Sequence, residues 1–200
     1  IVVDYLLKSI NRNFHKEVIY FEMRNSFDFS KYTSIFEKNG WEYSPHLNIK
    51  IDLYNKHLED ILSGMKYNRR REIKLSLKNS ARIEESVDLE KIQVLYNMLV
   101  ELYKTRVKLP LPPFEYFVQL FLSEIGKIFL VVHKNNVIGG SFCLFSEKSI
   151  NTLYYVGLRN YHKSIYPTHL AVFGAIKFGI SNNLEFLDMM GAGNQMKNMV

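Results

Sequence analysis

The sequence has a single cysteine, Cys143, among its 200 residues. A disulfide framework within the chain is therefore excluded, and this usage is typical of a protein in a reducing cytoplasm. No apolar run approaches the roughly 20 residues that a membrane-spanning helix requires. The first residues also lack the charged start, apolar middle and small-residue cleavage site of a signal peptide. We therefore expect a cytoplasmic protein.

Common catalytic and cofactor motifs are missing as well. The sequence contains no Walker loop, no glycine fingerprint of a dinucleotide-binding fold and no serine in a nucleophile elbow. Its six histidines do not show the spacing of metal ligands, so we expect neither a metal site nor a tightly bound cofactor.

Apolar and basic residues, in contrast, are abundant. Hydrophobic residues make up 47% of the chain and aromatic residues 14%, which is ample for a packed core in one large domain or two small ones. The formal net charge of +6 favours anionic partners such as nucleic acid, nucleotides or phosphorylated substrates.

Residues 150–190 predict a strand, a basic loop, a helix and a second strand. The first strand covers residues 150–156, Pro167 suits the first position of a helix that runs to residue 180, and the last strand stops at Gly191. The helix is apolar on most of its circumference, so we expect it to be covered on several sides. Its start faces a loop that holds Arg159, His162 and Lys163. A basic loop at a helix N-terminus can bind phosphate or carboxylate, so this loop is either part of an anion-binding cleft or merely solvated.

The remaining patterns predict further elements in chain order. Before residue 81 these are a helix over 2–14, a strand over 17–23, a short helix capped by Asp28 or Ser30 and ended by Asn39-Gly40, a strand over 41–53 with Pro45 at an edge or bend, and a helical stretch over 55–80. After it come a strand over 81–87, a helix starting at Asp88, a helix over 114–125, a strand over 127–132, a turn at Asn135-Asn136 and a strand over 137–145. The fold class is therefore α/β (α+β), with a mixed central sheet and flanking helices.

The helical stretch over 55–80 becomes strongly basic toward its end. It is either a solvated helix face or a phosphate-binding surface, because Arg69, Arg70 and Arg71 follow the aromatic Tyr67. Arg106 also has two readings: it ends the apolar stripe of the helix that starts at Asp88, so it reaches solvent or points into a cleft.

The hairpin turn predicts where Cys143 lies. A turn at Asn135-Asn136 pairs residues whose numbers sum to 271, which places Cys143 opposite Ile128 and away from His133. We therefore interpret Cys143 as a core residue rather than a nucleophile. A site without a covalent nucleophile suits direct transfer, in which an amine attacks an activated acyl group. Asp188 either orients that amine or accepts its proton, or else it caps the glycine turn that follows.

The order of these elements and their residue sequences resemble a known family. The sequence is similar to acyltransferases of the GNAT fold, and within them to the Fem-type aminoacyltransferases that build peptidoglycan cross-bridges and to acetyltransferases of the cellulose-biosynthesis type. The pieces that carry the resemblance are residues 68–80 (NRRREIKLSLKNS), 103–114 (YKTRVKLPLPPF), 137–140 (VIGG), 153–155 (LYY), Pro167 and 186–191 (FLDMMG).

The resemblance implies a domain organisation. Fem-type proteins consist of two GNAT-like domains, so residues 1–54 would be the back half of a first domain, 55–80 a basic helical connection, and 81–200 a second domain without its last strands. We therefore expect the chain to be a piece of a longer protein.

The resemblance also implies partners and roles. Ordinary GNAT enzymes bind acetyl-CoA with a glycine-rich loop that is missing here, whereas Fem-type relatives take an amino acid from aminoacyl-tRNA. The acceptor would be a nucleotide- or lipid-linked muropeptide, with tRNA and a membrane surface as further contacts. By resemblance, Arg106 matches an arginine that contacts the diphosphate of the cell-wall precursor, and Tyr155 matches a tyrosine of the cleft. Together with the patterns described above, this leads us to expect that Arg106 holds the anionic substrate with Arg159 and Lys163, and that Arg69 and Arg70 are further substrate-binding candidates. Tyr155 would position the acceptor, and Asp188 would assist proton removal.

Two alternative functions stay open at this point. One is an acyl-CoA-dependent N-acetyltransferase in polysaccharide or small-molecule biosynthesis. The other is a non-catalytic, anion-binding module that keeps the fold and the basic surface.

Overall fold

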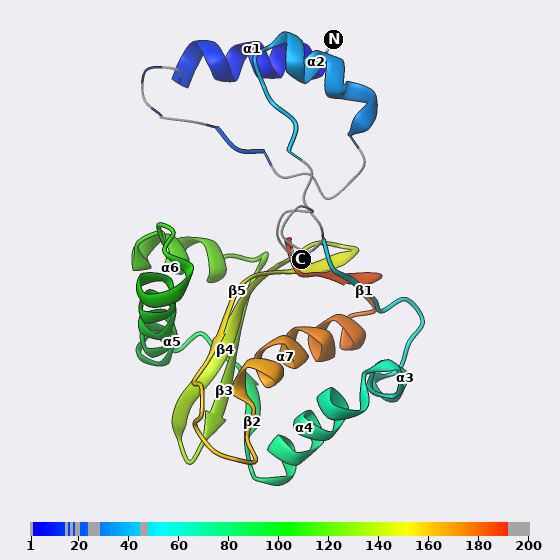
Figure 1. Cartoon of the computed structure of the whole chain (residues 1–200), viewed down its shortest axis with the longest axis vertical. Helices are drawn as coiled ribbons and strands as arrows, with labels where there is room; N and C mark the ends of the chain where they lie inside the picture. Colours follow the sequence, from blue (N-terminus) through cyan, green and yellow to red (C-terminus); the bar gives the residue numbers. More distant parts are fainter. Residues whose placement is uncertain are drawn as a thin grey trace. The chain divides into compact units, whose positions relative to one another are not determined.

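The computed structural model describes residues 2–14, 16, 18, 21–23, 29–44 and 48–191 (Figure 1). Its contacts divide the chain into two units, one made of residues 1–47 with 192–200 and the other of residues 48–191. Residues 55–80 pack inside the second unit, where Ile61, Leu62 and Ile73 join its core. The assignment of the chain to two GNAT-like domains joined by a connection stays a prediction.

The first unit contains α1 (Val2–Phe14), η1 (Ser30–Tyr32) and α2 (Thr33–Lys38), which confirms both predicted helices. Asn39 ties the end of α2 to α1, because its Nδ2 donates to Asp4 Oδ1 at 2.8 Å and its carbonyl accepts from Asn11 Nδ2 at 2.8 Å. Gly40 has a φ of 81°, as the predicted helix ending requires. Of the predicted strand over 17–23, residues 17, 19 and 20 lie outside the described residues and 21–23 form no strand; Asp28 and Pro45 also lie outside them.

The second unit is built on one mixed sheet, which confirms the predicted architecture. Its strand order is β1-β6-β5-β4-β3-β2, and all neighbours are antiparallel except β5 and β6, which are parallel. The strands are β1 (Lys50–Asp52), β2 (Arg82–Glu85), β3 (Gly126–His133), β4 (Asn136–Phe145), β5 (Ser149–Gly157) and β6 (Phe186–Asp188). Of the strand predicted over 41–53, residues 50–52 form a strand, residues 41–44, 48, 49 and 53 do not, and residues 45–47 lie outside the described residues.

Helices cover both faces of this sheet (Figure 1). One face packs against α5 (Leu89–Leu102), its continuation η2 (Tyr103–Val107) and α6 (Phe114–Phe121). The other packs against α7 (Pro167–Ser181), with α3 (Leu58–Gly64) and α4 (Tyr67–Lys78) beyond it. Because α7 lies between the sheet and α4, it is apolar on most sides, as the sequence predicts. In the described ranges, no helix is long and apolar enough to cross a membrane.

Local signals place several helix ends correctly. Asp88 accepts hydrogen bonds from the backbone of Glu90 and Lys91 and so caps α5, and Pro167 is the first residue of α7. The stretch predicted as helical over 55–80 is two helices, because Met65 adopts an extended conformation between α3 and α4.

The β3–β4 hairpin has a different register from the predicted one. Lys134 and Asn135, with φ of 49° and 63°, form the turn, so His133 pairs with Asn136. A bulge between Val131 and Val132 then shifts the register by one. Cys143 consequently pairs with Lys127 instead of Ile128. The prediction of its partner is wrong, because the turn residues lie one position earlier and the bulge gives no signal in the sequence.

Candidate functional site

The parallel strands β5 and β6 separate soon after they meet. They pair over three residues, from Ser149 opposite Phe186 to Asn151 opposite Asp188, and β5 then continues to Gly157. In the described part of the chain, no strand pairs with this edge of β5 after Asn151. Main-chain N–H and C=O groups along such an edge are available to a ligand.

A bulge in β5 decides which way its tyrosines point. Leu153 is the extra residue, because the register with β4 shifts between Phe142 and Cys143. Tyr154 therefore packs in the core on the α5 side, with its ring 6.1 Å from that of Tyr103. Tyr155 points to the opposite side of the sheet and is 40% exposed. The bulge thus aims one tyrosine of the unpaired edge at solvent.

Arg106 lies on the other side of the sheet from Tyr155. It belongs to the π-helical turn η2, which follows α5 and ends where Lys108 adopts a φ of 57° and donates to the carbonyl of Tyr103 at 2.7 Å. Arg106 is exposed. The structure therefore places the two predicted site residues on neighbouring elements but on opposite faces.

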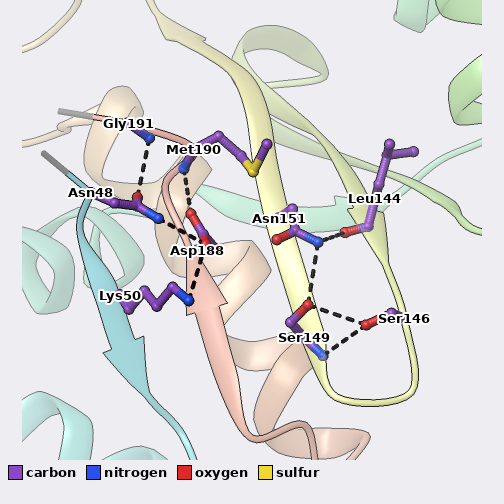
Figure 2. A network of polar contacts seen from close by, with 9 residues as sticks. All are labelled: Asn48, Lys50, Leu144, Ser146, Ser149, Asn151, Asp188, Met190 and Gly191. Atoms are coloured by element: carbon purple, nitrogen blue, oxygen red, sulfur yellow. Dashed lines mark hydrogen bonds and ion pairs between the residues drawn. The ribbon is translucent and has the colours of Figure 1, made fainter. Parts of the chain in front are cut away.

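Asp188 is the centre of a buried polar network at the end of β6 (Figure 2). Its Oδ2 accepts from Asn48 Nδ2 at 2.9 Å and lies 3.9 Å from Lys50 Nζ, while its Oδ1 accepts from the backbone N–H of Met190 at 2.7 Å. Asn48 Oδ1 in turn accepts from the Gly191 N–H at 3.1 Å. Asn48 therefore joins the start of β1 to the segment that follows β6.

These contacts favour one of the two readings of Asp188. The residue is 0% exposed and both of its carboxylate oxygens have donors, so a substrate amine cannot reach it in this arrangement. Asp188 pairs with Asn151, which lies four residues before Tyr155 on β5. Asp188 is therefore about 13 Å from Tyr155 along the strand direction. Capping of the turn at residues 188–191 is what the hydrogen bonds show.

Two glycines let α7 start directly against the sheet. Gly139 on β4 pairs with Gly157 on β5, and a Cβ at Gly139 would lie 2.8 Å from Val156 O and 3.2 Å from the Pro167 ring. A Cβ at Gly157 would overlap the backbone nitrogen of Thr168. The first turn of α7 therefore packs on bare backbone.

The N-terminus of α7 is also fastened to α4. Ser76, which is buried, accepts a hydrogen bond from the Tyr166 N–H at 2.9 Å and donates to Glu72 O at 2.7 Å. The N–H groups of His169 and Leu170 both donate to the carbonyl of Tyr166. At this helix start, which the sequence offered as an anion-binding site, the N–H groups of Tyr166, His169 and Leu170 are thus bonded within the protein.

The basic loop before α7 is compact. His162 organises it, because its Nδ1 accepts from the Ser164 N–H at 3.2 Å and its carbonyl accepts from the N–H of the buried Ile165 at 3.2 Å. Arg159 and Lys163 are exposed on this loop. They remain candidates for binding an anionic group that approaches from solvent.

Of the two candidate arginines in α4, one has a structural contact. Arg70 donates from Nη1 to the carbonyl of Ser63 at 3.1 Å and so joins α4 to α3. Arg69 is exposed, and its charge acts with burial to lower the pKa of His169 on α7. Arg69 therefore lies near the start of α7, whereas Arg70 stabilises the pair of short helices.

Cys143 is a core residue, as predicted. It is 0% exposed, and burial raises the pKa of its thiol to about 12 despite contacts with Ser141 and Thr152. At neutral pH this thiol is protonated and unreactive. Among the described residues, no group of three or more His, Cys, Asp or Glu side chains is placed to hold a metal ion.

Two structurally important residues, Ser76 and Asn48, were not identified by the sequence analysis. Ser76 interrupts the basic helix on its buried face, three positions after Ile73, and that position is the signal that could have identified it. Asn48 gives no such signal, because its partner Asp188 is 140 residues away in the chain.

Comparisons with known proteins establish the fold. No protein-family model matches the chain, and no curated protein sequence matches it. The crystal structure of FemX matches with a TM-score of 0.69 at 12% identity, covering 99% of this chain and 70% of that chain. The fold is of the Fem and GNAT type.

Two further structures share this fold. The C-terminal domain of a putative lysylphosphatidylglycerol synthetase from Agrobacterium fabrum matches with a TM-score of 0.62 at 9% identity, covering 83% of this chain and 53% of that one. The L-PGS of Bacillus licheniformis matches with a TM-score of 0.56 at 10% identity, covering 85% and 54%. This chain thus spans about half the length of both. The predicted GNAT-like fold is confirmed.

Proposed function

We propose that this chain belongs to an acyltransferase that moves an acyl group, and specifically an aminoacyl group, onto an amine. The observation that carries the proposal is the separation of parallel β5 and β6 after three residue pairs, in a chain that matches FemX over 99% of its length. Main-chain N–H groups along the unpaired β5 edge are suitable donors for the oxyanion that forms at an attacked acyl carbon.

The transfer is direct in this proposal. The only thiol in the chain, that of Cys143, is buried and protonated, so it does not serve as a covalent carrier. The acceptor nitrogen forms a bond to the acyl carbon, and the ester C–O bond of the donor breaks. The proton lost by the amine passes to the leaving oxygen.

The exposed side chains around the sheet supply binding. Tyr155 positions the acceptor at the unpaired edge, because it is the exposed tyrosine that the β5 bulge aims away from the core. Arg106, Arg159 and Lys163 hold anionic groups of the substrates. Asp188 contributes indirectly, by fixing the segment after β6 through Asn48 and Met190.

The closed N-terminus of α7 favours aminoacyl-tRNA over acyl-CoA as the donor. A diphosphate at this position would need free N–H groups at the helix start, and Ser76 and the backbone of Gly157 occupy that space. The resemblance to Fem-type enzymes supports the peptide of a nucleotide- or lipid-linked cell-wall precursor as the acceptor, and the reaction would then take place in the cytoplasm or at the membrane surface.

A transfer assay tests this proposal. The full-length protein is incubated with a nucleotide-linked muropeptide and either aminoacyl-tRNA or acetyl-CoA. The mass of the peptide is then measured by mass spectrometry. We expect a gain of one amino-acid residue with aminoacyl-tRNA. A gain of an acetyl group instead would assign the CoA-dependent alternative, and no gain with either donor would contradict acyl transfer to this acceptor.

A further inference from the structure

A basic pocket lies at the end of the sheet where β2 begins and β3 turns into β4. It has a volume of about 810 Å³, and its wall comes from the end of α4, the start of β2, the β3–β4 turn and the loop before α7. The cations Lys78, Arg82 and Lys134 line it together with His133 and His162, and none of its lining residues is acidic. A hollow with cations and no carboxylate is suited to an anion.

The basic groups of this pocket are close to one another. The rings of His133 and His162 are 6.5 Å apart, and His133 Nδ1 lies 2.9 Å from the hydroxyl oxygen of Tyr161. Burial lowers the pKa of His133, and the charges of Lys134 and His162 lower it further. These three residues therefore converge on one volume, although they come from a strand, a turn and a distant loop.

The pocket continues along α4. A second hollow of about 330 Å³ shares Lys78 with the first, and it is lined by Tyr67, Arg70, Arg71, Lys74, Leu75 and Lys78. Arg71, Lys74 and Lys78 are spaced by three and four residues, so they lie along one face of the helix. From Tyr67 to Lys78 the helix rises about 17 Å. We call Arg71, Lys74, Lys78, His133, Lys134 and His162 the basic track.

The charges of the basic track are poorly compensated by the protein. Like charges one helical turn apart destabilise a helix. In the described part of the chain, Arg71, Lys78 and Lys134 form no ion pair, and Lys74 approaches Glu59 only to 3.9 Å, with both side chains largely exposed. A row of cations that extends over a helix and into a pocket matches a chain of phosphates better than a single phosphate.

We propose that the basic track binds the phosphate backbone of RNA. Tyr67, which is 68% exposed at the start of the track, offers a ring on which a base can stack. The site is formed by α4, the β3–β4 turn and the loop before α7, whereas the proposed transfer takes place at the unpaired edge of β5. The inference rests on the proposed function only in taking tRNA as the first RNA to test.

The test compares two variants of the full chain with equal charge. Lys78→Gln/Lys134→Gln removes two track cations, and Lys148→Gln/Lys177→Gln removes two exposed lysines elsewhere; each lowers the formal net charge from +6 to +4. Binding of uncharged tRNA and of a single-stranded RNA oligonucleotide is measured by fluorescence anisotropy at several salt concentrations. Melting curves verify that both variants are folded.

We expect the track variant to lose about tenfold or more in affinity for RNA, and the slope of log K against log salt to become shallower by about 0.7–0.9 for each lost phosphate contact. The control variant should stay close to the unsubstituted protein. Equal losses in both variants, or no binding of either RNA, would overturn the proposal. Displacement of tRNA by inorganic pyrophosphate as effectively as by RNA would show a site for a small phosphate ligand and would also overturn it.

Uncharged tRNA binds without any transfer step. A failed transfer assay and a failed RNA site are therefore distinguishable, because the first leaves the difference between the two variants intact and the second removes it.

Discussion

Asp188 shows at the scale of one residue how a buried carboxylate holds two parts of a chain together. Its oxygens accept from Asn48 and from the Met190 N–H, so it fixes both the entry to β1 and the exit from β6 (Figure 2). The sequence predicts that Asp188 matters, because it precedes a glycine turn, but it leaves both capping and proton transfer open. The partner that favours capping, Asn48 just before β1, is visible only in the folded chain.

Substitution of Asp188 tests this role. Asp188→Ala leaves the Asn48 amide and the Met190 N–H without their acceptor, so we expect the free energy of unfolding to fall by about 1–3 kcal/mol. Urea titration measures this change. Asp52→Ala is the control, because Asp52 is exposed and pairs only at the surface, and it should change stability little. Unchanged stability together with abolished transfer would instead place Asp188 in the chemistry.

Gly157 packs against the start of α7, and its substitution should destabilise the folded protein. In Gly157→Ala the new Cβ would overlap backbone atoms of Thr168, which cannot move without shifting the helix. We expect a loss of about 1–3 kcal/mol in the free energy of unfolding, measured by urea titration. Gly64→Ala at the end of α3 has open space around its new Cβ and serves as the control. Equal stability of the two variants would refute the close approach.

At the scale of elements, the contact between α4 and α7 contains a titratable group. His169 on α7 stacks on Tyr166, and its Nδ1 lies 3.1 Å from Glu72 Oε2 on α4, in a geometry that makes no hydrogen bond. Burial lowers the pKa of His169, and the nearby Arg69 lowers it further against the opposing charge of Glu72. The net direction is down, since burial is the largest of these effects.

The lowered pKa of His169 predicts how the free energy of unfolding depends on pH. His169 binds a proton less readily in the folded state than in the unfolded state, where its pKa is about 6.5. The stability that the neutral side chain contributes is therefore fully present above about pH 6.5, and it is lost as the pH falls through the lower pKa of the folded state. We expect the free energy of unfolding to decrease from pH 7 to pH 5 and to decrease less in His169→Gln. His133 has a lowered pKa as well, so part of the decrease should remain in the variant. Urea titrations at several pH values measure both slopes, and a slope that is unchanged or steeper in His169→Gln would contradict the prediction.

Local chemistry predicts most elements of this fold, and tertiary contacts explain the exceptions. Asp88, Pro167 and the apolar circumference of α7 identify helix ends and a buried helix without reference to the rest of the chain. The bulges in β3 and β5 are set by how neighbouring strands pair, so neither the pairing of Cys143 with Lys127 nor the direction of Tyr155 follows from alternation alone. The closure of the α7 N-terminus depends on Ser76, which lies 90 residues before Tyr166.

At the scale of the whole molecule, the likeness to FemX extends over 99% of the chain although the identity is 12%. The two proteins therefore share a fold at low sequence identity. The candidate residues are distributed over both faces of the sheet: Arg106 lies on the α5 side, whereas Tyr155 lies on the α7 side. Patterns in the sequence bring these residues to notice but do not place them in space.

The most direct test of the account is a single-turnover reaction of the full-length protein with labelled aminoacyl-tRNA and a nucleotide-linked muropeptide, in which the masses of peptide and protein are followed together. We expect the peptide to gain one amino-acid residue while the mass of the protein stays constant, because the amine attacks the donor ester directly. A peptide of unchanged mass would contradict acyl transfer to this acceptor, and a protein that transiently gains the aminoacyl mass would contradict direct attack.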